Sequence, residues 1–237
     1  MALFLQYIAN ALWFHEKDCV LKINKHGFGI IAIELLLLVI SCFAISVFSV
    51  AATAACILFF VLFVFTVYFF RDPERRIPDG KGIIVSPADG RVVEIVQERE
   101  DQFCDKEMVR ISIFLNIFNV HVNRMPVAGS VRFIRRVQGR FFHAASHKAS
   151  LDNEQTMVGI ETGEGVKILV KQIAGFIARR IVCYAKINDG FSIGQRFGII
   201  KFGSRTDIFV PVHTRLNVVV GDKVHGGTTI LGTYEQL

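Results

Sequence analysis

The stretch Gly198-Ile-Ile-Lys-Phe-Gly-Ser-Arg-Thr-Asp-Ile-Phe-Val-Pro211 contains two apolar runs that meet at the dipeptide Gly203-Ser204. The β-branched and aromatic residues on both sides predict two strands with a small, conformationally free junction between them. Glycine does not shield its own carbonyl, and Ser204 places a hydroxyl one residue away. The bond is therefore a candidate site of chemistry, although a Gly-Ser pair taken alone is more often an ordinary turn.

Short β-branched runs bounded by Gly, Pro or Asp recur through the chain after residue 70 and predict more strands. They lie at Gly82–Val85, Arg91–Val96, Val109–Leu115, Val166–Val170, Ile181–Ala185 and Leu216–Val220. In this part of the chain, helix is predicted only over about Asp152–Thr156 or near Ala174–Arg180. The pattern indicates an α+β protein with a mainly-β catalytic domain, either a sandwich or a partly closed barrel.

An N-terminal helical membrane hairpin is predicted from residues 28 to 70, an apolar run whose one charged residue is Glu34. A single helix of this length would reach about 64 Å, against a hydrocarbon core of about 30 Å. Two spans joined by a tight turn fit better, and the small-residue stretch Ser46–Ala55 is the weakest part of the run. Basic residues flank both ends, so both ends are expected on the cytoplasmic side. A monotopic hairpin that enters one leaflet is the alternative, and Glu34 is expected near headgroup depth.

The chain divides into three segments on this basis. Residues 1–27 form an N-terminal cytoplasmic segment with a short amphipathic helix predicted over Phe4–Phe14, residues 28–70 form the membrane hairpin, and residues 71–237 form the catalytic domain. The boundary falls in the charged, proline-containing exit Arg71-Asp-Pro-Glu-Arg-Arg-Ile-Pro78.

Charge and cysteine content restrict the partners. The formal net charge of +6 suits an anionic partner, and the long apolar run favours lipid over nucleic acid. The five cysteines have neither metal-ligand nor redox spacing, which predicts reduced thiols in a cytosol and no metal site. A basic run is read as a solvated face, with contact to anionic lipid as the alternative; it consists of Arg132, Arg135, Arg136 and Arg140.

Two further polar clusters interrupt the strands. Ser86-Pro-Ala-Asp-Gly90 holds Asp89 in a turn, and the segment Asn116–Pro126 holds His121, Asn123 and Arg124. Taken alone, Asp89 is a turn residue and His121 a structural histidine. With Ser204 they supply an acid, a histidine and a hydroxyl, the components of an activated nucleophile.

Two functions that involve no self-cleavage remain open. The first is a membrane-anchored serine hydrolase that uses Asp89, His121 and Ser204 without self-cleavage, and it would need an oxyanion hole. The second is a lipoyl-like adaptor, which would require Lys223 to be modified at an exposed hairpin tip.

Several motifs together resemble the phosphatidylserine decarboxylase family in its short bacterial or archaeal form, from about Arg71 to the C-terminus. They are Ser86-Pro-Ala-Asp-Gly90, Phe114-Leu-Asn-Ile-Phe-Asn-Val-His-Val-Asn-Arg-Met-Pro126, Gln172-Ile-Ala-Gly-Phe-Ile-Ala-Arg-Arg180, Gly198-Ile-Ile-Lys-Phe-Gly-Ser-Arg-Thr-Asp207 and Gly221-Asp-Lys-Val224. The apolar hairpin that ends in Phe-Phe-Arg-Asp-Pro is also similar to family members.

The resemblance implies that the chain is a self-cleaving proenzyme. Ser204 would attack the carbonyl of Gly203, and elimination followed by hydrolysis would leave a membrane-bound chain 1–203 and a chain 204–237 capped by a covalent pyruvoyl group. This cofactor would form a Schiff base with phosphatidylserine and withdraw electrons during loss of CO2, which yields phosphatidylethanolamine. The resemblance also implies a location at the cell (inner, cytoplasmic) membrane with the catalytic domain in the cytoplasm, and it leaves a homo-oligomer open.

The family pattern further implies roles for three side chains. Asp89 would orient or charge His121, and His121 would act as base or proton donor near Ser204. The longer family form carries His-x-x-His where this chain has His121-x-x-Arg124. Arg124 is therefore expected either to hold the carboxylate or phosphate of the headgroup or to form a structural ion pair.

Overall fold

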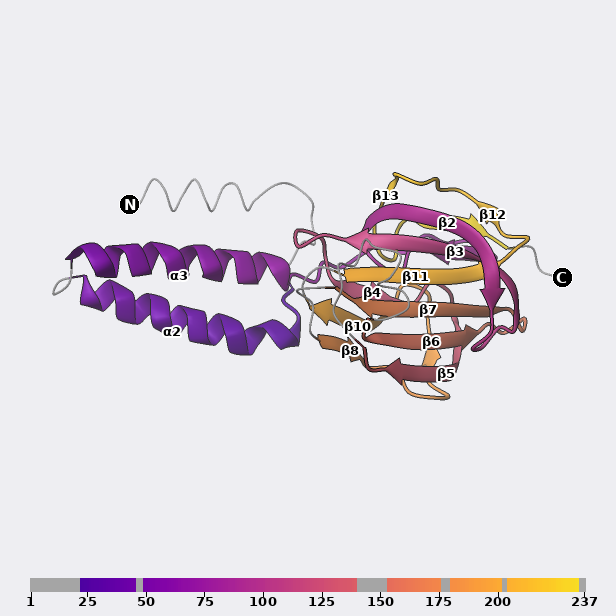
Figure 1. Cartoon of the computed structure of the whole chain (residues 1–237), viewed down its shortest axis with the longest axis horizontal. Coiled ribbons are helices and arrows are strands. Elements are labelled where there is room, and N and C mark those ends of the chain that lie inside the picture. The colour runs from indigo at the N-terminus through magenta and orange to yellow at the C-terminus, as the bar shows by residue number, and fades with distance from the viewer. Residues whose placement is uncertain (1–21, 46–48, 140–152, 176–179, 202–203, 235–237) are drawn as a thin grey trace.

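The computed structural model describes residues 22–45, 49–139, 153–175, 180–201 and 204–234. A pair of apolar helices projects from one end of a mainly-β domain (Figure 1), so the predicted architecture is confirmed. The amphipathic helix predicted at Phe4–Phe14 and residue Gly203 lie outside the described residues.

The hairpin consists of α2 (Phe28–Ala44) and α3 (Ser49–Phe69), and a 3-10 turn, η1 (Lys25–Gly27), precedes α2. At 1.5 Å per residue the helices are about 26 and 32 Å long, which matches a hydrocarbon core of about 30 Å. Both are apolar enough to cross a membrane, and only 11% of each span is buried inside the protein. Large side chains such as Phe43, 78% exposed, face outward, which suggests membrane association.

Polar and sulfur contacts join the two helices. The Thr66 hydroxyl donates to Glu34 Oε1 at 2.8 Å, and the Sγ atoms of Cys42 and Cys56 lie 3.1 Å apart. Glu34 thus accepts a hydrogen bond from the facing helix, an arrangement that stabilises helix pairs in an apolar medium.

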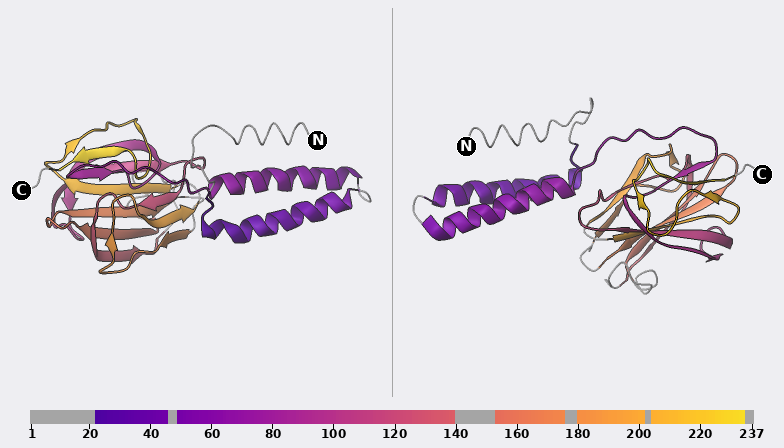
Figure 2. Two further views of the ribbon diagram at one scale, coloured as in Figure 1. Left: turned by 180° about the vertical axis from the view of Figure 1, so that it is seen from behind. Right: turned by 90° about the horizontal axis from the view of Figure 1, so that it is seen from above.

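The β-domain is built around an eight-stranded antiparallel sheet of order β13-β2-β3-β11-β7-β6-β5-β9, which curls into a half-barrel (Figure 2). Its strands, in chain order, are β2 (Gly90–Glu100), β3 (Lys106–Leu115), β5 (Gly129–Val137), β6 (Gln155–Glu161), β7 (Lys167–Ala174), β9 (Gly190–Phe191), β11 (Ser204–Pro211) and β13 (Lys223–Val224). Strand β11 lies between β3 and β7, so its backbone is hydrogen-bonded on both sides.

Two three-stranded sheets, of order β1-β14-β12 and β4-β10-β8, complete the domain. Their strands are β1 (Ile83–Val85), β4 (Val122–Arg124), β8 (Arg180–Cys183), β10 (Arg196–Lys201), β12 (Arg215–Leu216) and β14 (Ile230–Thr233). The main core combines side chains from all three sheets, among them Ile84, Ile113, Phe197, Ile208 and Leu231.

Two local predictions are wrong. The helix predicted over Asp152–Thr156 is absent where the structure describes it, because Gln155 and Thr156 begin β6. Pairing with β5 and β7 on both sides decides the conformation there. The strand predicted over Leu216–Val220 is shorter, since only Leu216 lies in β12. Of the helix predicted near Ala174–Arg180, Ala174 ends β7, Arg180 begins β8, and residues 176–179 lie outside the described residues.

The segment that leaves α3 is fastened to the β-domain by successive side chains. Arg71 donates to the carbonyl of Phe118 at 2.8 Å. Asp72 is 4% exposed and accepts from Arg196 Nε at 2.7 Å. Arg75 pairs with Asp89 at 2.8 Å. These contacts tie the base of the hairpin to the elements that carry the candidate site.

Candidate active site

Ser204 is the first residue of β11, and the preceding strand β10 belongs to a different sheet. The strands predicted on both sides of the Gly203-Ser204 bond are present. Ser204 pairs with Leu115 of β3 and with Ala174 of β7. Its side chain is 0% exposed, and Oγ has no hydrogen-bond partner in the described part of the chain. Buried polar groups without a partner are rare in native proteins, and a catalytic role is one reason for their presence.

His121 ends the loop between β3 and β4, and its imidazole is also fully buried. Its backbone carbonyl accepts a hydrogen bond from the N–H of Ile200 at 3.2 Å, four residues before Ser204. The same loop leaves β3 at Leu115, the residue that pairs with Ser204. His121 and Ser204 therefore lie at the same end of the domain, next to the hairpin.

The contacts of the His121 ring define its protonation. Nδ1 lies 2.9 Å from the carbonyl oxygen of Asn119, which can only accept, so Nδ1 carries the hydrogen. Burial away from water lowers the pKa of His121 to about 4, although the Asn119 hydrogen bond and the Asp89 charge act in the opposite direction. At neutral pH the ring is therefore uncharged and Nε2 has a free lone pair. Nε2 is buried and has no partner among the described residues, so it is available as a base.

The end of the apolar hairpin packs against His121. The ring of Phe69, the last residue of α3, lies 4.3 Å from the His121 ring, centroid to centroid. Phe70 packs in the same apolar cluster with Val122 and Ile199. The base of the hairpin thus contributes to the burial that keeps His121 neutral.

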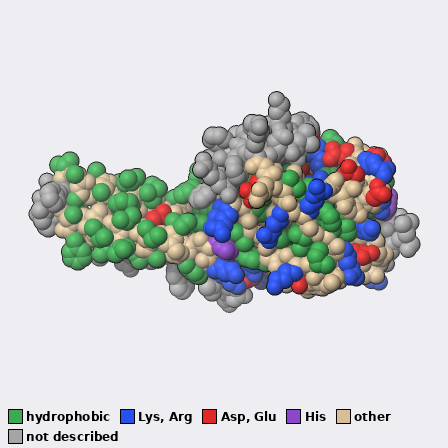
Figure 3. Space-filling model, turned by 60° about the horizontal axis from the view of Figure 1, so that its bottom comes forward, with side chains coloured by type: hydrophobic (Ala, Val, Ile, Leu, Met, Phe, Trp, Pro, Cys, Tyr) green, Lys and Arg blue, Asp and Glu red, His purple; other side chains and the backbone are tan. Residues whose placement is uncertain are grey.

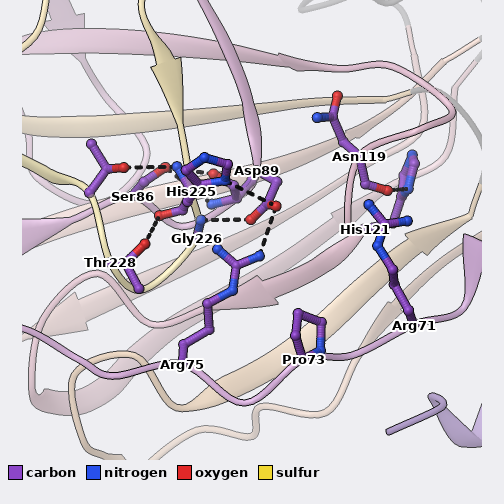
Figure 4. A network of polar contacts seen from close by, with 12 residues as sticks. Arg71, Pro73, Arg75, Ser86, Asp89, Asn119, His121, His225, Gly226 and Thr228 are labelled. Atoms are coloured by element: carbon purple, nitrogen blue, oxygen red, sulfur yellow. Dashed lines mark hydrogen bonds and ion pairs between the residues drawn. The ribbon is translucent and has the colours of Figure 1, made fainter. Parts of the chain in front are cut away.

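Asp89 lies in the turn before β2, and its carboxylate contacts Arg75, His225 and Gly226 instead of His121. Oδ2 pairs with Arg75 at 2.8 Å and lies 3.5 Å from His225 Nδ1, while Oδ1 accepts from the N–H of Gly226 at 2.8 Å. Figure 4 shows Asp89 turned toward Arg75 and Gly226, and His121 turned toward Asn119. The Asp89 charge still acts on His121, whose pKa it raises, though less strongly than burial lowers it.

Arg124 is 5% exposed, and its guanidinium is occupied by the protein itself. It donates to the carbonyls of Gly194 at 3.0 Å and Pro73 at 2.9 Å, and it forms a 3.4 Å ion pair with Asp72. These contacts fit a structural ion pair and not a group that is free to bind a headgroup. Through them Arg124 connects the segment after α3 to the β-domain.

Sequence reasoning gave no role to three polar side chains beside Ser204. Asn123 Nδ2 donates to the Thr206 hydroxyl at 3.2 Å, and Gln172 Nε2 donates to Asn123 Oδ1 at 2.8 Å. Thr206 lies two residues beyond Ser204 on the same face of β11. Gln172 Oε1 is buried without a partner among described residues. The available signal was the presence of polar residues inside strands that are otherwise apolar.

The structure provides a hydroxyl, a neutral imidazole with a free lone pair and an ion-paired carboxylate, each of them buried. These groups suit proton transfer and attack by an oxygen nucleophile. Among the described residues, no group of three or more His, Cys, Asp or Glu side chains is placed to hold a metal ion.

Comparison with known proteins assigns the family. The model of the phosphatidylserine decarboxylase family matches residues 62–232. The phosphatidylserine decarboxylase proenzyme of Citrifermentans bemidjiense is 47% identical over 204 residues, which cover 86% of this chain and 91% of that protein. The corresponding proenzyme of Desulfotalea psychrophila is 45% identical over 194 residues, covering 80% of this chain and 91% of the relative. That of Geotalea uraniireducens is 48% identical over 174 residues, covering 73% and 81%. The chain thus belongs to the phosphatidylserine decarboxylase family of enzymes.

Proposed function

We propose that this protein decarboxylates phosphatidylserine to phosphatidylethanolamine with a pyruvoyl group that it makes from Ser204 by cleaving its own Gly203-Ser204 bond. The observation that carries the proposal is a pair of buried groups without partners among described residues, Ser204 Oγ and His121 Nε2. They lie at the same end of the domain. Ser204 Oγ is a nucleophile that requires a base, and His121 Nε2 is a base that can accept its proton. The family membership gives the substrate.

Self-cleavage needs two events at residue 204. In the first, Oγ loses its proton and attacks the carbonyl carbon of Gly203, so that an ester replaces the amide and the amine of residue 204 is freed. In the second, a base removes the Cα proton of residue 204, the ester C–O bond breaks, and Gly203 leaves as a carboxylate. The resulting dehydroalanine takes up water and releases ammonia, which leaves a ketone. The neutral imidazole of His121 is the base that we assign to these steps.

The buried position of residue 204 suits a ketone cofactor. A pyruvoyl group carries no hydroxyl, so the side chain that lacks a hydrogen-bond partner in the described structure is the one that would be consumed. When formed, the group supplies an electron sink for the carbanion left by loss of CO2. Strands β3 and β7 hold residue 204 from both sides, and Phe69 packs against His121.

The roles of the other predicted residues follow from their contacts. We assign to Asp89 an indirect effect on His121, since its carboxylate pairs directly with Arg75 and its charge raises the pKa of His121. The donors of Arg124 are engaged by Gly194, Pro73 and Asp72, which favours the structural ion pair over headgroup binding.

The hairpin would hold this chemistry beside the membrane. We infer that both helices enter the inner membrane from the cytoplasmic side, because basic residues flank both ends of the apolar run. Chain 1–203 would keep the hairpin, and chain 204–237 would remain as β11 and the strands that follow it, held by pairing with β3 and β7. The substrate would reach the site from the bilayer.

The two alternatives have weaker support. A hydrolase would keep its chain whole, whereas the relatives are named proenzymes, which favours a processed chain. A lipoyl-like adaptor would need Lys223 at a hairpin tip, whereas Lys223 lies in β13 and pairs with Arg91 of β2.

Intact mass of the purified protein under denaturing conditions tests the proposal. Two chains that separate between residues 203 and 204 are expected, with the smaller chain blocked at its N-terminus. Borohydride with an added amine should increase the mass of this chain, because the ketone reacts with amines. The variant Ser130→Ala serves as a control and should be cleaved like the natural protein. One unbroken chain in a preparation that makes phosphatidylethanolamine would refute the proposal.

A further inference from the structure

Basic side chains without an acidic partner among the described residues gather at the base of the hairpin. Lys201 ends β10 and Arg180 begins β8, and these two residues are direct cross-strand partners. Like charges in this position repel each other and weaken the pairing of the strands. Burial and the charge of Arg180 lower the pKa of Lys201, as expected for cations held close together.

Lys25 and His26 join this pair from the turn before α2. Lys25 Nζ lies 4.8 Å from the centre of the Tyr184 ring, one residue after β8, and the ring of His26 stacks on Tyr184 at 5.9 Å. Lys201 Nζ lies 5.9 Å from the centre of the Phe70 ring at the end of α3. Cations from η1, β8 and β10 therefore surround the point where the apolar helices begin and end.

The cluster Lys25, His26, Arg180 and Lys201 has no acidic partner in the part of the chain that the structure describes. His26 Nε2 is in addition buried without a hydrogen-bond partner among those residues. The basic run of β5 is different, because Arg132 pairs with Glu161 and Arg135 donates to Gln102. Figure 3 shows basic and histidine side chains gathered on the domain beside the hairpin. Uncompensated cations at this position suit an anion from outside the chain.

We propose that Lys25, His26, Arg180 and Lys201 form a binding site for the phosphate of an anionic phospholipid. The occupant is a membrane lipid because the cations lie at the level where α2 starts and α3 ends, which is where headgroups meet the hydrocarbon core. Its acyl chains can lie along the exposed apolar side chains of the hairpin, and its phosphate relieves the repulsion between Lys201 and Arg180.

The site lies close to the proposed reaction centre. Lys201 precedes Ser204 by three residues, so their Cα atoms are at most about 11 Å apart. Phosphatidylserine is itself an anionic phospholipid, and in this respect the inference rests on the proposed function. Recognition of the phosphate needs no cleavage or turnover, so the two proposals can fail separately.

Lipid retention measures the site directly. Full-length protein in a neutral detergent is titrated with phosphatidylglycerol or with phosphatidylcholine of the same acyl chains, and bound lipid is counted by native mass spectrometry. We expect tighter binding of phosphatidylglycerol, and a loss of about 30-fold in its affinity when Lys25→Gln and Lys201→Gln are combined. The control pair Lys106→Gln and Lys186→Gln removes the same charge from exposed positions outside the cluster and should leave the affinity unchanged.

Two results would overturn the inference: equal affinity for the two lipids, or equal losses in the cluster and control variants. The same titration on Ser204→Ala protein should give the same affinities, which separates lipid binding from self-cleavage.

A stability measurement distinguishes a lipid site from a structural role of Lys201. Without anionic lipid, Lys201→Gln should raise Tm by about 1–2 °C, because it removes the repulsion with Arg180. Added phosphatidylglycerol should raise Tm of the natural protein more than that of the variant. A lower Tm for Lys201→Gln in neutral detergent would show that the lysine stabilises the fold, and would contradict the proposal.

Discussion

Strand β11 has polar side chains on both of its buried faces, and the two faces differ in whether these side chains have hydrogen-bond or ion-pair partners. On one face, Arg205 pairs with Asp207 at 2.6 Å and donates to Ser112 at 2.9 Å, and Arg110 of β3 pairs with Glu94 at 2.7 Å. On the other face, Ser204 Oγ has no partner among the described residues. Burial is nearly complete on both faces, so burial alone does not mark a reactive group. The difference is that structural charges are paired, whereas the groups assigned to chemistry are left with unused donors and lone pairs.

The strongest test of this comparison is Ser204→Ala. We expect one uncleaved chain and a fall in decarboxylation of about 10⁴-fold or more, because neither the nucleophile nor the ketone can form. Stability should change by less than about 1 kcal/mol, since the lost hydroxyl has no hydrogen-bond partner among the described residues. Intact mass, phosphatidylethanolamine production and thermal unfolding check the three parts.

Ser204→Cys is the matched variant, and it should cleave slowly because a thiol can make the same acyl shift. If Ser204→Ala kept its decarboxylase activity, residue 204 would not be the source of the cofactor.

The paired face predicts the opposite outcome. Asp207→Asn should lower the free energy of unfolding by about 3–5 kcal/mol, because it leaves Arg205 as a buried charge without its carboxylate. Glu161→Gln is the control, since its ion pair with Arg132 is half exposed and should contribute less than about 1 kcal/mol. Both are measured by denaturant unfolding in the Ser204→Ala protein, in which a single chain unfolds. Equal effects of the two substitutions would show that the buried pair is not structural.

Sequence alone predicted the parts of the molecule whose signals are local. The hairpin followed from the length of one apolar run, and the strands around Ser204 followed from β-branched residues on either side of Gly203. Strand β6 was missed because six of its seven residues are buried, so there is no polar alternation to detect.

The partners of the site residues depend on contacts that sequence spacing does not reveal. Asp89 pairs with Arg75 because the exit of the hairpin crosses the domain at that point, and this crossing is a property of the assembled fold. The burial that keeps His121 neutral comes partly from Phe69, which the sequence places in a membrane helix 52 residues away. Composition and periodicity contain neither fact.

A pH titration tests whether burial keeps His121 uncharged in the folded protein. Its pKa is about 4 in the folded protein against an ordinary value of 6.5, so between these values the unfolded chain binds a proton that the folded chain does not. The contribution of His121 to stability is complete above pH 6.5 and is lost as the pH falls toward 4, by about 3 kcal/mol. Denaturant unfolding of Ser204→Ala protein across this range, with and without His121→Asn, isolates the contribution. A pH dependence identical in the two proteins would mean that His121 is not held neutral by burial.

The smallest expected effect comes from Thr206→Val, which tests whether the Thr206 hydroxyl takes part in cleavage. Thr206 shares the face of Ser204, but its hydroxyl accepts from Asn123 at 3.2 Å and is therefore satisfied like the ion pairs on the other side. Removing it should cost about 1 kcal/mol of stability, because Asn123 keeps its contacts with Gln172 and with the carbonyl of Pro87. Cleavage, followed by intact mass, should still go to completion. If a folded Thr206→Val protein were not cleaved, a hydroxyl that already has a hydrogen-bond partner would take part in the reaction. The lack of a partner would then not distinguish reactive from structural groups on β11.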